Sequence, residues 1–319
     1  MNKQLRKRFA SPKPKYRVTN WRQYNAALVK RGSLTLWIDE AVIDRWHQVS
    51  GKGAIYHDDA ILCALCLRQV FGLALRQTQG FLHSLAAMLE LAVKVPHYST
   101  LSRRAEGLKV PARCLKRNDQ SGPLHLVIDS TGLKVFGEGE WKVRVHGVDK
   151  RRVWRKLHLG VDEASGEILA HQLTMNNVHD GPVLPGLLDQ IDKPLDQVSA
   201  DTAYDSFRCH RAICDRDARP VIPPRKGASI LPPRTMKDPP PTRGRIVQRI
   251  HQIGRKEWKK ESNYHRRSLA ETAMFRFKTI IGPKLQNRSF KNQKTEAAIG
   301  VAILNTFTAL GMPETSRIG

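Results

Sequence analysis

Residues 124–129 have the sequence LHLVID, an apolar run rich in β-forming residues that ends on the carboxylate of Asp129. A short apolar run of this kind predicts an inner strand of a sheet. A carboxylate at the end of such a strand leaves the core and lines the crevice in which α/β sheets bind their ligands. This stretch therefore predicts both a sheet and the first residue of a site.

The segments that follow predict the rest of the sheet. A hairpin with its turn at DEASG is expected over residues 154–175, and a strand that ends near Asp201 is expected after it. The remaining patterns predict a helix at 181–192, a helix at 206–217 and a last strand at 218–224. Strand, hairpin, helix, strand, helix and strand in this order imply an α/β fold whose mixed sheet has a parallel part.

The chain before this sheet has the pattern of short helices. Helical segments are expected at residues 58–73, 75–91 and 95–108, and the last of them carries Arg103 and Arg104. Short helices joined by tight turns, with a basic helix at the end, are typical of a helix-turn-helix DNA-binding module. A small helical bundle without DNA binding has the same pattern and stays an alternative.

Composition divides the chain further. Residues 1–31 contain ten Lys or Arg and no acid, which predicts a basic flexible arm that wraps DNA or, as the alternative, a solubilising tail. Eight prolines between residues 220 and 241 exclude helices and inner strands there and predict an extended basic loop. The expected parts are the arm at 1–31, a helical DNA-binding domain at 32–118, an α/β domain at 119–313 with a proline-rich basic insertion at about 220–262, and a tail at 314–319.

The charge of the chain indicates a polyanionic partner. Lys and Arg number 54 against 29 Asp and Glu, which gives a formal net charge of +25. Nucleic acid is the first candidate, since phosphate contacts by basic side chains supply much of such an affinity. A membrane surface ranks second, because no basic amphipathic segment is set apart for anchoring. An odd number of irregularly spaced cysteines, no signal sequence and no apolar stretch long enough for a bilayer predict a cytoplasmic protein.

A third acid lies in the basic stretch NYHRRSLAETAMFRFK, residues 263–278. At about 100° per residue of an α-helix, Tyr264, Arg267, Glu271 and Lys278 share one face about 60° wide, opposite the apolar residues. By itself this pattern favours a solvated Arg267–Glu271 salt bridge worth about 0.2–0.5 kcal/mol. Together with Asp129 and Asp201, it favours a catalytic set of three carboxylates.

Three stretches resemble the DDE transposases of bacterial insertion sequences, of the insertion-sequence-five group. VIDSTGLKVFGEGEW (127–141) resembles the segment around that family's first aspartate, and SADTAYDS (199–206) resembles the segment around the second. Tyr264, Arg267, Glu271 and Lys278 match its Y-(2)-R-(3)-E-(6)-K signature without a change of spacing. The third stretch is the most specific, because four residue types are fixed at three spacings.

The resemblance implies a ribonuclease-H-like catalytic domain in which Asp129, Asp201 and Glu271 bind two Mg²⁺, with Mn²⁺ as a substitute. Hard oxygen ligands suit these ions, and two of them can activate the attacking oxygen and stabilise the leaving oxygen at phosphorus. It also implies that Arg267 and Lys278 hold phosphates and that Tyr264 contacts DNA. The expected partners are the terminal inverted repeats of the element, target DNA and further copies of the chain in a dimer or larger assembly, at the bacterial nucleoid.

Two other hypotheses stay open at this point. A DNA-binding repressor without catalysis explains the charge and the helical region but leaves the three acids as a coincidence. A ribonuclease-H-like nuclease without strand transfer explains the acids, and a strand-transfer assay with the ends of the element separates it from a transposase.

Overall fold

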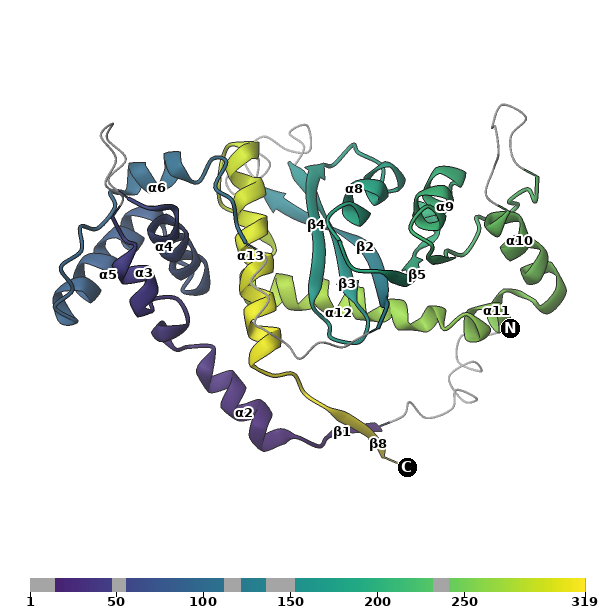
Figure 1. Cartoon of the computed structure of the whole chain (residues 1–319), viewed down its shortest axis with the longest axis horizontal. Helices are drawn as coiled ribbons and strands as arrows, with labels where there is room; N and C mark the ends of the chain where they lie inside the picture. The colour runs from purple at the N-terminus through teal and green to yellow at the C-terminus, as the bar shows by residue number, and fades with distance from the viewer. Residues whose placement is uncertain (1–14, 48–55, 112–121, 136–152, 232–240, 319) are drawn as a thin grey trace, which may run out of the picture.

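The computed structural model describes residues 15–47, 56–111, 122–135, 153–231 and 241–318. It consists of a helical part, a mixed sheet with helices on both faces, and a two-stranded ribbon formed by the two ends of the described chain (Figure 1). The mixed α/β class predicted by the sequence is confirmed.

The sheet has the strand order β4-β3-β2-β5-β6, with β7 paired to the far end of β2. Its strands are β2 (Leu124–Val135), β3 (Trp154–Asp162), β4 (Ile168–Met175), β5 (Leu195–Ala200), β6 (Arg219–Val221) and β7 (Lys284–Leu285). The neighbours β2–β3 and β3–β4 are antiparallel, whereas β2–β5 and β5–β6 are parallel. Three antiparallel strands continued by two parallel ones form the ribonuclease-H-like arrangement. The predicted hairpin, with its turn at DEASG, is confirmed.

Strand β2 differs from the prediction at one end. The sequence predicts that it stops at Asp129, but it continues to Val135. The reason is its antiparallel neighbour β3, which pairs with β2 from Leu126 as far as Lys134. The apolar run marks only the part of β2 that lies between β3 and β5, because β5 ends at Ala200, opposite Ile128.

Alternation along β2 directs its side chains to two separate cores. Leu126 and Ile128 pack in the core covered by α8 (Leu184–Leu188) and α9 (Phe207–Cys214). Val127 and Leu133 pack in the opposite core, covered by α12 (Ser268–Arg276) and α13 (Phe290–Leu310). Because successive residues of a strand point to opposite faces, Asp129 belongs to the face that α12 covers.

The helical part precedes the sheet in the chain. Its helices are α3 (Glu40–Asp44), α4 (Asp58–Val70), α5 (Leu75–Met88) and α6 (Tyr98–Arg104), after a 3-10 turn at Leu34–Leu36. Four residues connect α4 to α5, whereas nine connect α5 to α6, so only the first connection is a tight turn. The helix-turn-helix assignment stays a prediction, and the expected boundary near residue 119 lies outside the described residues.

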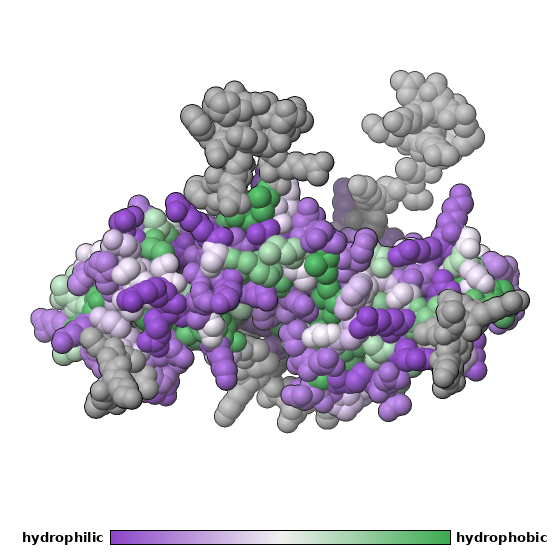
Figure 2. Space-filling model, turned by 90° about the horizontal axis from the view of Figure 1, so that it is seen from above, coloured by the Kyte–Doolittle hydropathy of each residue, from purple (hydrophilic) through white to green (hydrophobic). Residues whose placement is uncertain are grey.

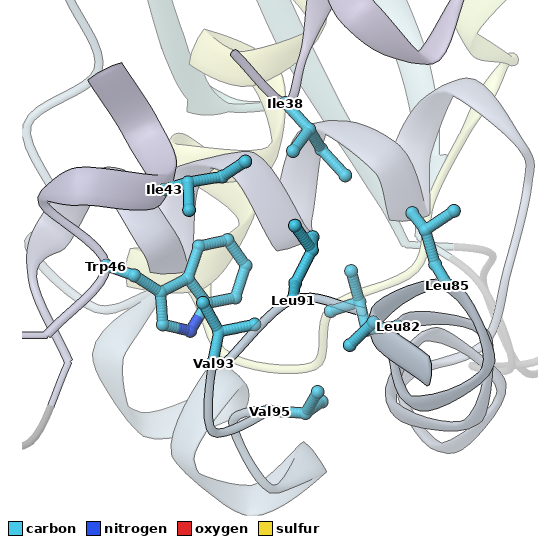
Figure 3. Close-up of a pocket in the computed structure, with 9 residues that line it drawn as sticks. Ile38, Ile43, Trp46, Leu82, Leu85, Leu91, Val93 and Val95 are labelled. Carbon is cyan, nitrogen blue, oxygen red and sulfur yellow. The ribbon is translucent and has the colours of Figure 1, made fainter. Parts of the chain in front are cut away.

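This helical core is apolar up to its edge. Figure 3 shows an apolar pocket at the edge of this core, where Ile43 of α3, Trp46 just after α3, Leu82 of α5, and Leu91 and Val93 after α5 converge. Cys63 and Cys66 are also buried in this core, inside α4.

Helix α13 completes both the helical core and the sheet. Ile299, Ile303 and Phe307 on one side pack with α4, while Val301 and Leu304 pack with the sheet and α12. Figure 1 shows α13 standing between the two parts of the molecule. The helical part therefore depends on a helix from the far end of the chain.

The two ends of the described chain differ from the expected arm and tail. Strand β1 (Lys15–Val18) pairs with β8 (Thr315–Ile318), and helix α2 (Trp21–Lys30) follows β1. The Asn20 side chain holds this arrangement: its amide donates to the Met312 carbonyl at 3.0 Å and its oxygen accepts from the Glu314 N–H at 2.8 Å. Residues 1–14 and 319, which the predicted arm and tail also include, lie outside the described residues.

The proline-rich insertion leads into two further helices, α10 (Thr242–Ile253) and α11 (Arg255–Glu261). Arg243 attaches them to the sheet through a buried bidentate pair with Asp205, at 2.7 and 3.0 Å. Residues 232–240 of the insertion lie outside the described residues.

The surface seen from above is mainly hydrophilic, with hydrophobic residues in small separate patches (Figure 2). Within the described residues, none of the helices combines the length and the apolar character that crossing a membrane requires.

We expect Gly300→Ala to lower the free energy of unfolding and Gly80→Ala to raise it. A Cβ at Gly300 would lie 2.8 Å from the Phe277 ring, so overpacking would cost about 1–3 kcal/mol against a helix-propensity gain of about 1 kcal/mol. Gly80 is the matched control, because it lies inside α5 with open space around its Cβ position. Urea unfolding measures both variants, and equal stabilisation would contradict the close packing of α13.

Candidate active site

Asp129 and Asp201, two of the predicted acids, each follow one member of a residue pair in the neighbouring parallel strands β2 and β5. Ile128 of β2 pairs with Ala200 of β5, so Asp129 and Asp201 are the next residues of the two strands. Neighbouring strands lie about 4.8 Å apart, which brings two residues that are distant in sequence side by side. The Asp201 side chain caps the following turn by accepting from the Ala203 N–H at 2.9 Å. The edge of the sheet therefore holds both side chains near one another.

The third acid, Glu271, lies on α12, which packs across β2 and β3. The segment from Tyr264 is not the single regular α-helix that the helical wheel assumed. It begins with a 3-10 turn (Tyr264–Arg267), continues as α12 and ends in a π-helical turn (Phe277–Ile281). Arg267 and Glu271 therefore share one face as expected, whereas Tyr264 and Lys278 lie in the 3-10 and π-helical turns and are displaced from that face.

Arg267 connects the acids. Its Nη1 donates to the Asp129 carboxylate at 2.6 Å, and its Nη2 donates to the Glu271 carboxylate. The Arg267 and Asp129 side chains are 20% and 15% exposed, whereas Glu271 is 55% exposed. The solvated Arg267–Glu271 pair considered from the sequence is present, and it is one half of a bridge that reaches a half-buried aspartate.

The electrostatics of this cluster favour a cation. Burial raises the pKa of the Asp129 carboxyl, and the negative charges of Asp201 and Glu271 raise it further. The Ser130 N–H, at 2.8 Å, and the Arg267 guanidinium act in the opposite direction on that pKa. Three carboxylates that influence one another, with one guanidinium between them, attract additional positive charge.

Tyr264 lies elsewhere than the wheel placed it. Its side chain is only 9% exposed and packs with Trp258 of α11 and Val221 of β6. Burial raises the pKa of its phenol, and the Arg267 guanidinium lies 5.8 Å from its ring centre. The Tyr264 ring therefore packs against the Arg267 guanidinium on one side and against Trp258 of the insertion on the other.

Lys278, the last member of the signature, lies in the π-helical turn after α12 and is partly exposed. Its expected contact with phosphate stays a prediction. π-Helical turns insert an extra residue into a helix and are frequent at functional sites.

Arg103 and Arg104, the two arginines of the helical part predicted to bind DNA, have different surroundings. Arg103 is exposed, whereas Arg104 donates to Asp58 at 2.5 Å and to the Tyr56 carbonyl at 3.1 Å. These contacts attach α6 to the start of α4. DNA binding by either residue stays a prediction.

Sequence reasoning missed Tyr204. It lies in the turn after Asp201, is fully buried, and its hydroxyl makes no hydrogen bond with the described part of the chain. Burial raises the pKa of this phenol, and the charges of Asp180, Asp129 and Asp201 raise it further. The only signal in the sequence is its position three residues after Asp201.

The donor set fits a divalent metal ion in its chemistry. Carboxylate oxygens are the ligands that Mg²⁺ prefers, and burial, with the charges of Asp201 and Glu271, raises the pKa of Asp129. In the part of the chain that the structure describes, three His, Cys, Asp or Glu side chains do not converge into a ready metal-binding group. Arg267 instead supplies the positive charge between Asp129 and Glu271.

Comparison with known proteins shows which family models the chain matches. Residues 120–306, more than half of the chain, match a family model described as "Transposase DDE domain". Residues 29–138 match a second model with the same description. Among solved structures, the chain is similar to the piggyBac transposase in a synaptic complex with hairpin DNA, with a TM-score of 0.38 and 11% identity. That similarity covers 88% of this chain and 75% of the other.

We expect the two halves of the Arg267 bridge to differ in strength. Double-mutant cycles with Arg267→Ala should give a coupling energy of about 2 kcal/mol with Asp129→Ala and about 0.5 kcal/mol with Glu271→Ala. The physical reason is burial, because hydrogen bonds to charged groups are stronger where solvent is excluded, whereas exposed i,i+4 pairs are weak. Urea unfolding measures both cycles. A larger coupling energy with Glu271 than with Asp129 would contradict the conclusion that the buried Arg267–Asp129 contact is the stronger half of the bridge.

Proposed function

Because the chain belongs to the transposase DDE domain family, we propose that it binds the terminal inverted repeats of its own element and catalyses Mg²⁺-dependent cleavage and transfer of DNA strands. The observation that supports this most strongly is the register of the parallel strands. This register pairs Ile128 with Ala200, the residues before Asp129 and Asp201, and Arg267 bridges Asp129 and Glu271.

In this proposal Asp129, Asp201 and Glu271 hold two Mg²⁺ ions, which supply Lewis-acid activation of the attacking oxygen and stabilisation of the leaving oxygen. Strand β2 and strand β5 fix the two aspartates rigidly, since both emerge directly from paired backbone. Glu271 is the adjustable ligand, because its side chain is exposed and pairs with the side chain of Arg267.

The chemistry consists of two displacements at phosphorus. In the first, water attacks the phosphodiester at the end of the element, the bond to the 3′ oxygen breaks and a 3′-OH is released. In the second, that 3′-OH attacks a phosphodiester of target DNA and replaces its 3′ oxygen. Neither displacement requires a covalent bond between protein and DNA.

Arg267 has two consecutive tasks in this proposal. Before DNA binds, its guanidinium offsets the charge of Asp129 and Glu271 and so holds these two acids together. A guanidinium also binds phosphate in a bidentate manner, so the same group can turn to the scissile phosphate once other cations neutralise the carboxylates. Lys278 provides a further cation on the same segment.

We expect Asp129→Ala, Asp201→Ala and Glu271→Ala to abolish Mg²⁺-dependent nicking at the 3′ ends of the element while terminal DNA binding is retained. Asp196→Asn is the matched control, since Asp196 is an exposed acid at the opposite end of β5 from Asp201. It should nick at the wild-type rate, as measured on an end-labelled duplex.

Variants of the three acids that cut DNA normally would overturn the proposal. A wild-type protein that nicks the ends but does not join them to target DNA would instead be a nuclease without strand transfer. A joining assay with pre-nicked ends distinguishes these two results.

A further inference from the structure

The β1–β8 ribbon is a separate structural feature that the site does not use. It pairs Lys15 with Ile318, Tyr16 with Arg317, Arg17 with Ser316 and Val18 with Thr315. In Figure 1 it extends with α2 from the end of α13, away from the mixed sheet. The two strands come from opposite ends of the described chain.

Both faces of this ribbon are open to solvent. All its residues are exposed except Val18, which is partly buried. An isolated pair of strands is only marginally stable in water, so its geometry needs external support. The Asn20 side chain, together with the bond from the Thr19 N–H to the Glu314 carbonyl at 2.8 Å, gives that support at the base of the ribbon.

The charged side chains of the ribbon are all basic, and Tyr16 adds an aromatic ring. Lys15 and Arg17 lie on one face, and Arg317 lies beside Tyr16 on the other. Neither strand contains an acid, and the one acid next to the ribbon in the sequence is Glu314. Helix α2 adds basic side chains and no acid. A paired, exposed ribbon whose charged side chains are all basic is complementary to a polyanion.

We propose that the β1–β8 ribbon is a second DNA-binding element, which contacts the phosphate backbone of duplex DNA apart from the catalytic carboxylates. A two-stranded ribbon has the dimensions that the major groove admits. Long basic side chains on both faces reach phosphates, which position a protein without reading sequence. This inference rests on the proposed function, because it takes the DNA of that reaction as the ligand.

A second copy of the chain is the competing occupant, since exposed strand edges can also pair with one another. Charge argues against it. Two ribbons packed together would bring Lys15, Arg17 and Arg317 close to their own copies, and like charges opposed across a sheet are destabilising.

The first test compares two double variants of the full chain. Arg17→Gln with Arg317→Gln removes one cation from each face of the ribbon. Lys193→Gln with Arg208→Gln removes two exposed cations from the turn before β5 and from α9, as a control of equal charge. The probes are a terminal-repeat duplex and an unrelated duplex of the same length, titrated by fluorescence anisotropy at several salt concentrations.

We expect the ribbon variant to bind both duplexes about fivefold more weakly at about 0.15 M salt for each phosphate that it no longer reaches, with the salt slope reduced by about 0.9 per phosphate. The control should keep the wild-type slope. Equal slopes for the two variants would overturn the proposal.

The second test keeps the ribbon folded while it changes the charge. Ser316→Glu places an acid directly across from Arg17, which stabilises the pair of strands and should still weaken DNA binding. If this variant instead changes only the self-association measured by light scattering, the ribbon contacts a second copy and the proposal fails. Nicking at saturating DNA should be the same for this variant as for the wild type. A wild-type protein that never nicks would contradict the proposed function, but it would not affect the binding test of the ribbon.

Discussion

Repulsion between carboxylates is the constraint on which the site depends. The parallel pairing of β2 with β5 brings Asp129 and Asp201 to adjacent positions, and α12 adds Glu271. Such a group is unfavourable without positive charge. Burial raises the pKa of Asp129, and the charges of Asp201 and Glu271 raise it further. Arg267 supplies the charge, and the surrounding structure supports Arg267 in turn. Tyr264 packs beneath its guanidinium, and Trp258 packs against Tyr264.

The insertion therefore has a structural role in the site, in addition to its basic residues. Its helices α10 and α11 build the apolar cluster that buries Tyr264, and the Arg243–Asp205 pair attaches them four residues after Asp201. Removing one partner of a buried pair lowers the free energy of unfolding by about 3–5 kcal/mol, so the fold depends strongly on this pair. Strands β2 and β5, the insertion and the arginine bridge form one connected unit.

Local patterns in the sequence predict much of this, and the errors have physical causes. The hairpin, the strand before Asp201 and the parallel part of the sheet follow from short-range periodicity. The extension of β2 does not, because it depends on β3 and not on the apolarity of residues 130–135. The helical wheel assumed one period of about 3.6 residues, whereas 3-10 and π turns flank α12. The burial of Tyr264 and the pairing of the two ends arise from contacts that no local pattern contains.

The sharing of α13 between two cores has a consequence for how the chain folds. Its residues 290–310 close the helical core, whose other buried members occur before residue 109, and also the core on the α12 face of the sheet. Contacts so distant in sequence are slow to form, since loop closure must precede them. During synthesis both cores stay open until α13 leaves the ribosome, and exposed apolar surface of this kind favours aggregation and binding by chaperones. Folding of the two parts is thus expected to be a single late and cooperative event.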